Sequence, residues 1–454
     1  MSLYDLIIRN GQVVAADGVT HADIAVADGR IADIGPALEG AAKEEIDAGG
    51  LHVFPGVIDA HLHFNEPGRS EWEGFATGSR ALAAGGTTTY FDMPLNSHPP
   101  TIDAQAFDLK LAAAQAQSLV DFGLWGGIVP GNLDRMEELA ERGVVGFKAF
   151  MSNSGIEDFQ AVDDLTLYEG MVKAAKLGCI VAVHAENDAI TSLMARRAIS
   201  EGKLSVRDYL DSRPVIAELE AIIRAILFAR ETGCALHIVH VSTGRGVSLV
   251  AASRLSGIDV SCETCPHYLL LTEEDVEQLG AVAKCAPPIR SQGEQESLWR
   301  HLADGTLEMV ASDHSPSPPG MKVGDDFFKI WGGISGCQSM LQLLLTDGYV
   351  RRKLPLTTIA SVTAEYVARR FRVAPAKGSL AIGADADITL VDLAHSAALR
   401  AEDLLYRHRH SPYVGKTLHG RIVRTIVRGT TVYRDGKIVS GPIGRLVTPL
   451  RTTP

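Results

Sequence analysis

The stretch VFPGVIDAHLH, residues 53–63, combines a fold signal with a chemical one. It begins as a short apolar run, which predicts a buried β-strand. It ends in His61-Leu-His63, and because side chains alternate across a strand, the two histidines share one side. Two imidazoles at this spacing can chelate one metal ion. An exposed loop end can carry the same pair, so the rest of the chain decides between the two interpretations.

The chain from residue 53 to 375 alternates short apolar segments with amphipathic stretches. This alternation is typical of βα units around a parallel sheet. The expected strands are residues 53–61, 87–93, 122–129, 144–150, 180–184, 235–240, 259–262 and 307–312. Helices are expected between them, for example over residues 71–84, 163–177 and 214–232. Eight such units predict an α/β protein with a TIM-type (β/α)8 barrel. A doubly wound sheet is the alternative, because pattern alone does not fix the strand number.

The two ends of the chain, residues 1–52 and 376–454, hold short alternating segments joined by turns. Asn10-Gly11 predicts a hairpin turn, because both residues tolerate positive φ. Residues 386–392 and 422–433 repeat the same style. We therefore expect one smaller β-domain, built from both termini, beside a barrel at 53–375.

Composition narrows the class of protein. The chain has 43 basic and 55 acidic residues, a net charge of −12, and no basic block, so nucleic acid and anionic membranes are not expected partners. The six cysteines are scattered, and the N-terminus has no basic-then-apolar signal region. No apolar run approaches the roughly 20 residues that span a bilayer. A reducing, cytoplasmic setting is expected.

Residues with metal-ligand chemistry recur at four further strand ends. They are Lys148, His184, His240 and Asp313. Singly, each has an ordinary explanation: a histidine after an apolar strand is commonly half-buried, and an aspartate there commonly caps a helix. Six candidates on five strand ends of one barrel instead predict a metal centre at its C-terminal face.

Lys148 predicts that the centre holds two metal ions. It is flanked by Phe147 and Phe150 on a buried strand, where an ammonium ion loses its hydration. If the neutral amine takes up carbon dioxide, the resulting carbamate, an N6-carboxylysine, is anionic and offers one oxygen to each metal. The alternative is a lysine that extends to the barrel mouth.

Two metals that share a hydroxide lower the pKa of water from 15.7 to roughly 7 and polarise a scissile carbonyl. Asp313 would accept the proton during attack and deliver it to the leaving nitrogen, as a general base and then acid. This chemistry is suited to amide hydrolysis. Zinc is the expected ion, and cobalt, manganese, iron or nickel would suit the same ligands.

Other candidates carry less weight. Cys262-x-x-Cys265 has no second pair and no histidine at zinc-finger spacing, so both are interpreted as strand-end thiols. His237 lies an odd number of residues before His240 and is expected on the opposite side of the strand, as a packing residue. His267 and His314 are candidates for groups around the ligands, with no role assigned.

The order His-x-His, Lys, His, His, Asp on successive strands resembles the cyclic-amidase branch of the amidohydrolase superfamily, which contains dihydroorotases, hydantoinases, dihydropyrimidinases and allantoinases. The resemblance covers essentially the whole chain and implies that the terminal β-domain is a β-sandwich. It also implies the ligand set His61, His63, Lys148, His184, His240 and Asp313.

Within the branch, four motifs resemble those of allantoinases. They are HFNEPGRSEWEG (63–74), DMPLN (92–96), ETCPHY (263–268) and FKIWGGISG (328–336). Hydantoinases and dihydropyrimidinases carry a tyrosine where this chain has Asn153, and dihydroorotases an arginine where it has Asn65. A ring that bears a carboxylate would therefore lose its counter-charge here.

The resemblance implies hydrolysis of allantoin, a neutral cyclic ureide, to allantoate in purine breakdown. The implied substrate contacts are Asn96, Asn153 and backbone groups near Ala286 and Gly332. Relatives in the branch are mostly homotetramers, and the same assembly is expected here. Two alternatives are a hydantoinase or dihydropyrimidinase with relaxed ring selectivity, and a non-catalytic scaffold, which would typically lack metal ligands.

Overall fold

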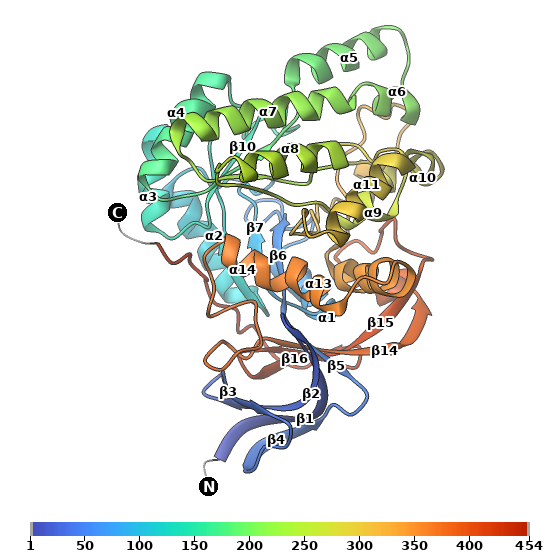
Figure 1. The fold of residues 1–454 in the computed structure, drawn as a ribbon. Coiled ribbons are helices and arrows are strands. Elements are labelled where there is room, and N and C mark those ends of the chain that lie inside the picture. Colours follow the sequence, from blue (N-terminus) through green and yellow to red (C-terminus); the bar gives the residue numbers. More distant parts are fainter. Residues whose placement is uncertain (1–2, 452–454) are drawn as a thin grey trace.

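The apolar segment before the two histidines forms strand β6 (Val57–Leu62), which is buried along its whole length. The structure is a computed structural model that describes residues 3–451 (Figure 1). Strand β6 pairs in parallel with β7 (Thr87–Asp92), which pairs in parallel with β8 (Asp121–Leu124). Parallel strands of this kind are buried on both faces, which explains their nearly continuous apolar sequence.

The remaining barrel strands form a second parallel sheet in sequence order. They are β9 (Gly126–Gly127), β10 (Phe147–Phe150), β11 (Val181–His184), β12 (Leu236–Ile238) and β13 (Val260–Cys262). Strand β9 follows β8 after one residue, so the two serve as a single barrel strand.

Isolated parallel bridges close the ring. Thr264 pairs with Val310, and Leu62 pairs with His314. The segment from 307 to 314 therefore lies between β13 and β6 as the eighth strand, although it forms bridges only and no continuous strand. A closed ring excludes a doubly wound sheet, and the predicted barrel is confirmed.

Helices surround the ring (Figure 1). The larger ones are α1 (Phe75–Ala84), α2 (Ala104–Gln117), α4 (Asp164–Lys176), α5 (Asp188–Ser200), α7 (Val215–Thr232), α8 (Gly244–Leu255) and α11 (Gln292–Ala303). The shorter ones are α3 (Met136–Glu141), α6 (Val206–Asp211), α9 (Pro266–Leu270), α10 (Glu273–Leu279), α12 (Met340–Leu343), α13 (Leu356–Ala360) and α14 (Tyr366–Arg370). No helix within residues 3–451 has the length and apolar character needed to cross a membrane.

Capping residues in the sequence determine where these helices begin and end. The side chain of Asp163 accepts a hydrogen bond from the backbone of Thr166 and caps α4, and α7 starts directly after Pro214 and ends at Gly233 with a left-handed φ of 68°. Both helices match their predicted ranges to within a residue. Helix α1 starts later than predicted because Gly74, at φ 86°, interrupts the chain just before Phe75.

Segments near both ends of the chain form a β-domain at the opposite end of the molecule from α5 and α7 (Figure 1). Residues 444–451, predicted as part of this domain, instead return to the barrel, where Leu446 pairs with Phe122 of β8. The strands of the β-domain are β1 (Leu3–Ala15), β2 (Gly18–Ala27), β3 (Arg30–Gly35), β4 (Ala41–Asp47), β5 (His52–Pro55), β14 (Ile388–Ala398), β15 (Thr417–Val427), β16 (Thr430–Arg434) and β17 (Lys437–Ile438). One hydrogen-bonded sheet runs in the order β17-β16-β15-β14-β5-β1-β2-β3, with β4 beside β1.

This sheet folds over at β1, whose first half pairs with β4 and whose second half pairs with β5. Apolar side chains from β1 to β5 and from β14 and β15, such as Ile8, Ile24, Val53 and Ile388, form a core separate from the barrel. Apart from adjoining loop residues, the cluster contains only side chains of these strands. The sheet therefore packs against itself, as a sandwich does.

The predicted hairpin at Asn10-Gly11 is wrong. Both residues lie inside β1, at a bulge in its pairing with β2, and the hairpin turns later, at residues 16–17. Asn10 has a φ of 61°, and its N–H donates to Asp23 Oδ1 at 2.9 Å. The Asn-Gly pair correctly indicates a positive φ. Because a bulge and a tight turn both use this conformation, the sequence does not distinguish them.

A buried ion-pair cluster joins the barrel to the β-domain. Lys377 Nζ lies 2.5 Å from Asp121 Oδ2 at the start of β8, and 2.9 and 2.7 Å from Asp385 and Asp387 just before β14. Arg428 also binds Asp121. Burial opposes the charged form, but the three carboxylates raise the pKa of Lys377. The ammonium occupies the position that a cation would need among these aspartates.

We expect Lys377→Met to destabilise the protein by about 3–5 kcal/mol, because it leaves buried carboxylates without their main counter-charge. Chemical denaturation of the variant and the parent measures this difference. Lys437→Met, at an exposed lysine of β17, is the matched control and should change the free energy of unfolding by less than about 0.5 kcal/mol. Equal stability of the two variants would contradict the assignment.

Candidate metal centre

Five of the six predicted ligands lie at or just beyond the carboxyl end of a barrel strand and line one cavity, and Lys148 lies within its strand. His61 and His63 end β6, Lys148 lies on β10, and His184 ends β11. His240 and Asp313 follow β12 and the eighth strand. Side chains from five separate strands meet here, as in other barrel enzymes.

One cluster consists of His61, His63 and Asp313. The Nε2 atoms of His61 and His63 lie 3.3 and 3.4 Å from Asp313 Oδ1. A tetrahedral zinc ion with ligands at about 2.0–2.2 Å separates those ligands by about 3.3–3.6 Å. The three ligand atoms all lie within 4.8 Å of one another, so they can hold one metal ion without rearrangement.

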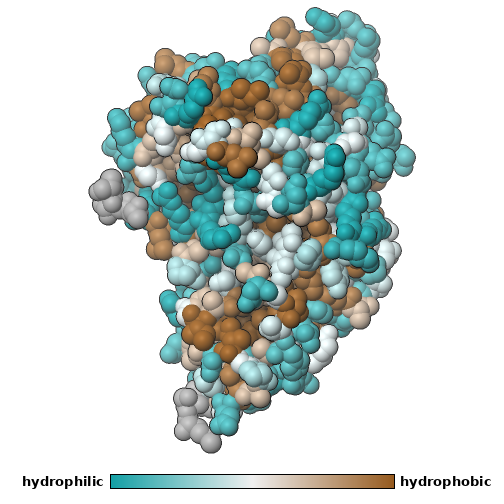
Figure 2. Space-filling view, in the orientation of Figure 1, coloured by the Kyte–Doolittle hydropathy of each residue, from teal (hydrophilic) through white to brown (hydrophobic). Residues whose placement is uncertain are grey.

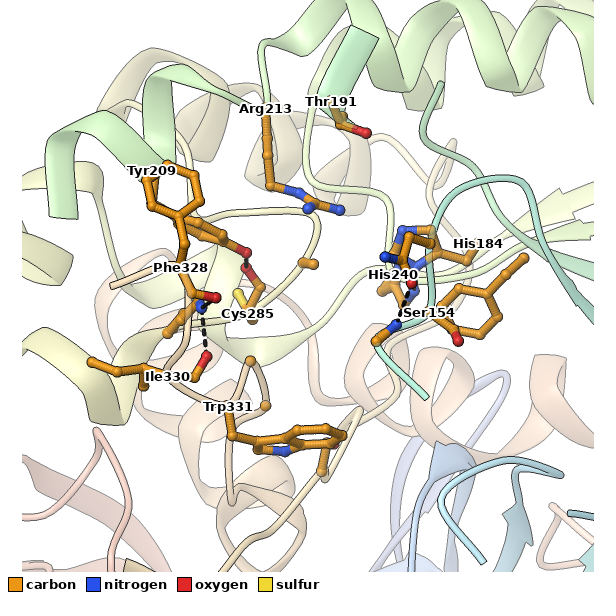
Figure 3. Close-up of a pocket in the computed structure, with 18 of the residues that line it drawn as sticks. Ser154, His184, Thr191, Tyr209, Arg213, His240, Cys285, Phe328, Ile330 and Trp331 are labelled. Atoms are coloured by element: carbon orange, nitrogen blue, oxygen red, sulfur yellow. Dashed lines mark hydrogen bonds between the residues drawn. The ribbon is translucent and has the colours of Figure 1, made fainter. Parts of the chain in front are cut away.

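His184 and His240 form a second cluster, visible as the adjoining rings in Figure 3. His184 Nδ1 lies 3.1 Å from His240 Nε2, and His184 Nε2 lies 2.8 Å from Glu186 Oε2. When Nε2 of His184 donates to Glu186, its Nδ1 presents a lone pair toward His240. Burial lowers the pKa of both histidines, that of His240 strongly, and so favours the neutral form that binds metals.

Lys148 lies close to both clusters. Its positive charge acts to lower the pKa of His184 and of His240, and the negative charge of Asp313 acts to raise the pKa of Lys148. The Nζ atom is buried, has no hydrogen-bond partner, and lies 4.7 Å from the centre of the Phe150 ring. Burial lowers the pKa of Lys148 to about 8. A buried amine without a hydrogen-bond partner, close to two groups of potential metal ligands, is consistent with a lysine that carries a covalent modification.

Two buried carboxylates orient the histidines, a role that was not predicted. Glu263 Oε1 lies 2.6 Å from His61 Nδ1, and Glu186 binds both His184 and Arg213. Burial acts to raise the pKa of Glu263, but His61 and His237 lower it to about 2. A carboxylate on the far nitrogen fixes the tautomer and the orientation of a ligating imidazole. Both glutamates stand at strand ends in the sequence, which was the only available signal.

The packing role predicted for His237 is wrong. Its ring is buried and bonds Ser261 Oγ at 2.8 Å and Glu263 Oε2 at 3.1 Å, so it points inward and shares Glu263 with His61. Strand β12 ends at Ile238, and His240 has a φ of 39°. The alternation of sides therefore breaks between residues 237 and 240.

Other sequence candidates surround the ligands without joining them. His314 Nδ1 accepts a hydrogen bond from the Gly336 N–H, and its carbonyl accepts one from the His63 N–H at 2.8 Å. His267 is buried with neither ring nitrogen hydrogen-bonded, and burial lowers its pKa to about 4. Cys262 and Cys265 are free, buried thiols, as predicted.

A cavity of about 430 Å³ opens onto both clusters (Figure 3). Its lining includes all four predicted substrate contacts, Asn96, Asn153, Ala286 and Gly332. Arg213, Tyr209, Lys284 and residues 328–331 also line it and were not predicted. In Figure 3 the two histidines lie on one side of the cavity and Tyr209, Phe328 and Ile330 on the other.

Backbone conformation contributes to this arrangement. Asp313 and His240 have positive φ values, 43° and 39°, which residues other than glycine rarely adopt. Asn65 and Asn96 share this feature, at 64° and 68°. Three of these four residues, Asn96, His240 and Asp313, line the cavity, which is typical of a functional site that the surrounding structure holds in place.

Comparison with known proteins gives a consistent result. Residues 52–432 match the Amidohydrolase family. The chain is 62% identical to an allantoinase of Rubrobacter xylanophilus over 451 residues, 99% of each chain, and 58% identical to one of Solibacter usitatus over 449 residues, 99% of this chain and 98% of the other. The L-hydantoinase (dihydropyrimidinase) of Arthrobacter aurescens superposes with a TM-score of 0.96 at 37% identity, over 98% of this chain and 100% of that one. A dihydropyrimidinase of Brevibacillus agri superposes at 0.92 with 32% identity, over 98% and 99%.

We expect Glu263→Gln to weaken zinc binding by about 10–100-fold, because the neutral amide no longer holds His61 in the ligating orientation. Competition with a chromogenic chelator measures the affinity. Glu277→Gln, at an exposed partner of Arg207, is the matched control and should bind zinc like the parent. Unchanged affinity in Glu263→Gln would show that this carboxylate does not support a ligand.

Proposed function

The chain belongs to the amidohydrolase family, and on that basis we propose that it hydrolyses the ring amide of allantoin to allantoate in purine breakdown. The allantoinase activity predicted from the sequence is confirmed by full-length similarity to allantoinases. The observation that carries the catalytic role is that His61, His63, His184, His240 and Asp313 line one cavity. Lys148 Nζ is buried 4.7 Å from the ring centre of Phe150, which lines the same cavity.

The residues present fit two divalent metal ions. His61, His63 and Asp313 would hold one ion, and His184 and His240 the other, with Lys148 between them. The facing nitrogens of His184 and His240 and the unpartnered amine of Lys148 support this assignment. When bound, the metals would supply an acidified water and polarise the amide carbonyl. Zinc is the ion we propose.

Lys148 would bridge the two ions as a carbamate. The lone pair of its neutral amine forms a bond to the carbon of carbon dioxide, one C–O π bond opens, and the amine nitrogen releases a proton. The lowered pKa, about 8, makes the neutral amine available near neutral pH. Without this modification the buried Nζ has no partner to offset its desolvation.

Asp313 is the proposed general base and acid. Burial acts to raise the pKa of Asp313, but His61, His63 and His240 hold it well below its usual range, so the side chain is a carboxylate at neutral pH. It takes one proton from the attacking water and passes it to the ring nitrogen as the C–N bond breaks. One water is consumed: its hydroxyl joins the carbonyl carbon and its proton joins the nitrogen.

The cavity wall suits a neutral ureide. Asn96, Asn153, Ala286 and Gly332 are the proposed contacts, and they offer amide groups without charge. Asn153 Oδ1 accepts a hydrogen bond from the Gly155 N–H at 2.9 Å, which leaves its NH₂ group as the available donor. Asn65, where dihydroorotases carry an arginine, is buried against Pro316.

A hydantoinase or dihydropyrimidinase activity is the second candidate. It is favoured by the superposition on solved structures with those names. The higher identity to allantoinases favours the ureide with the additional arm. A non-catalytic scaffold is disfavoured, because every expected ligand is present in the sequence and five of the six line the cavity.

A homotetramer in the cytoplasm completes the proposal. Exposed apolar side chains gather on α5 and α7: Leu193, Ile199, Ile216, Ile223 and Leu227. Part of this surface forms the brown patch near the top of Figure 2. A continuous apolar face of this kind suits contact with another copy of the chain, and the particle mass in solution decides this point. The six buried free cysteines support a reducing compartment.

We expect the purified enzyme to show a higher kcat/KM for allantoin than for hydantoin or dihydrouracil. Allantoin alone adds a neutral ureido arm that can bond to the amide groups of the wall. Initial rates with the three substrates, with metal content measured on the same preparation, test this. A larger kcat/KM for either simpler ring would favour the second candidate.

Lys148→Ala should lose both metal ions and more than about 99% of the activity, because the bridge and its charge are removed. Added bicarbonate or a short carboxylic acid should restore part of both. Elemental analysis and allantoin turnover measure the two effects, with exposed Lys437→Ala as the control. Retention of two metals by Lys148→Ala would refute the bridge.

A further inference from the structure

Residues 327–333 form one wall of the cavity without any regular secondary structure. Phe328 and Ile330 lie on this wall, across the cavity from His184 and His240 (Figure 3). The rings of Trp331 and Trp72 pack edge to face, with their centres 4.9 Å apart. A loop with no helix or strand needs another source of order if it is to recognise a small polar substrate.

Lys284 provides three hydrogen bonds to this wall. Its Nζ donates to the carbonyls of Phe327 at 2.6 Å, Phe328 at 3.4 Å and Ile330 at 2.5 Å. Its own backbone carbonyl accepts from the Gly333 N–H at 2.9 Å. The ammonium also lies 4.5 Å from the centre of the Tyr209 ring, so it is held from two sides.

Lys322 forms hydrogen bonds to the second half of the same wall. Its Nζ donates to the carbonyls of Trp331 at 3.0 Å and Gly333 at 2.5 Å. A third bond goes to the carbonyl of Ala281 at 3.1 Å, in the segment that leads to Lys284. The two lysines therefore tie residues 327–333 to the chain that supplies Ala286.

Among residues 3–451, the hydrogen-bond partners of both ammonium groups are all backbone carbonyls, and neither group forms an ion pair. An ammonium has three N–H donors, and each of these lysines directs them at three carbonyls. Buried cations are normally paired, because an unpaired one is costly. Backbone carbonyls in place of a counter-ion indicate that the bonds serve to hold the backbone.

Gly332 is the residue that this arrangement leaves free. Five of the seven carbonyls from 327 to 333 accept a lysine hydrogen bond, whereas neither the N–H nor the carbonyl of Gly332 has a partner among the described residues. A Cβ added to Gly332 would meet no atom within 4 Å. Its peptide groups are thus available to a ligand in the cavity that it lines.

We propose that Lys284 and Lys322 are positioning residues for substrate recognition, which hold the wall so that the free peptide groups of Gly332 meet the ureide. The identity of the ligand rests on the proposed function. The holding of the wall does not, because it is a property of the protein alone.

The experiment compares Lys284→Met and Lys322→Met with the parent, each with its metals. Lys353→Met is the matched control, since Lys353 also donates to a backbone carbonyl, that of Val350, but from an exposed position outside the cavity. Hydrogen exchange of peptides that cover residues 327–334 should be about tenfold faster in both test variants. The KM for allantoin should rise about tenfold, with kcat within about threefold and metal content unchanged.

A third variant, Lys322→Gln, keeps two of the three donors and should give intermediate exchange and KM. Parental exchange and KM in the two methionine variants would overturn the proposal. A fall in kcat at constant KM would overturn it too, because the lysines would then act on the chemistry.

The parent itself supplies a test that needs no variant. The amides of Trp331 and Gly333 should be protected from exchange although they lie outside helices and strands. Exchange as fast as in exposed loops would overturn the proposal. Absence of allantoin turnover by the parent would instead overturn the proposed function and leave the exchange result valid.

Discussion

The parallel bridge between Leu62 and His314 closes the barrel, and the site depends on it. Leu62 stands between His61 and His63, and His314 directly follows Asp313. The bridge, with the hydrogen bond from the His63 N–H to the His314 carbonyl, brings the first and last strands into register. The carboxylate of Asp313 thereby reaches both imidazoles, although 250 residues separate them in sequence.

Two of the four histidines have a buried carboxylate as a hydrogen-bond partner, whereas Nδ1 of His63 and Nδ1 of His240 have none among residues 3–451. Glu263 holds His61, and Glu186 holds His184. These carboxylates lie behind the imidazoles, so the remaining nitrogens face the cavity with their lone pairs. The Nζ atom of Lys148 likewise has no hydrogen-bond partner among the described residues. The carbamate that we propose at Lys148 would supply the missing partners.

The barrel and the loops around the cavity carry different kinds of information. The superposition on a hydantoinase, at a TM-score of 0.96, covers the barrel and the β-domain alike, so the scaffold does not distinguish one ring from another. The substrate contacts that we propose, Asn96, Asn153 and Gly332, lie instead in the walls of the cavity. Fixed carbonyls around Lys284 and Lys322 give an irregular wall the rigidity that strands give to the ligands.

The sequence by itself predicted the barrel, the smaller β-domain and the strand ends at which the six proposed ligands lie, because strand alternation and strand ends are local patterns. Only the tertiary structure decided how Asn10 and His237 are used. Asn10 takes a positive φ inside a strand, and β12 ends two residues before the predicted end of its strand. It also decided that Glu263 and the two wall lysines matter. Glu263 bonds a histidine about 200 residues away, and the two lysines bond backbone carbonyls. Local sequence patterns do not predict either kind of partner.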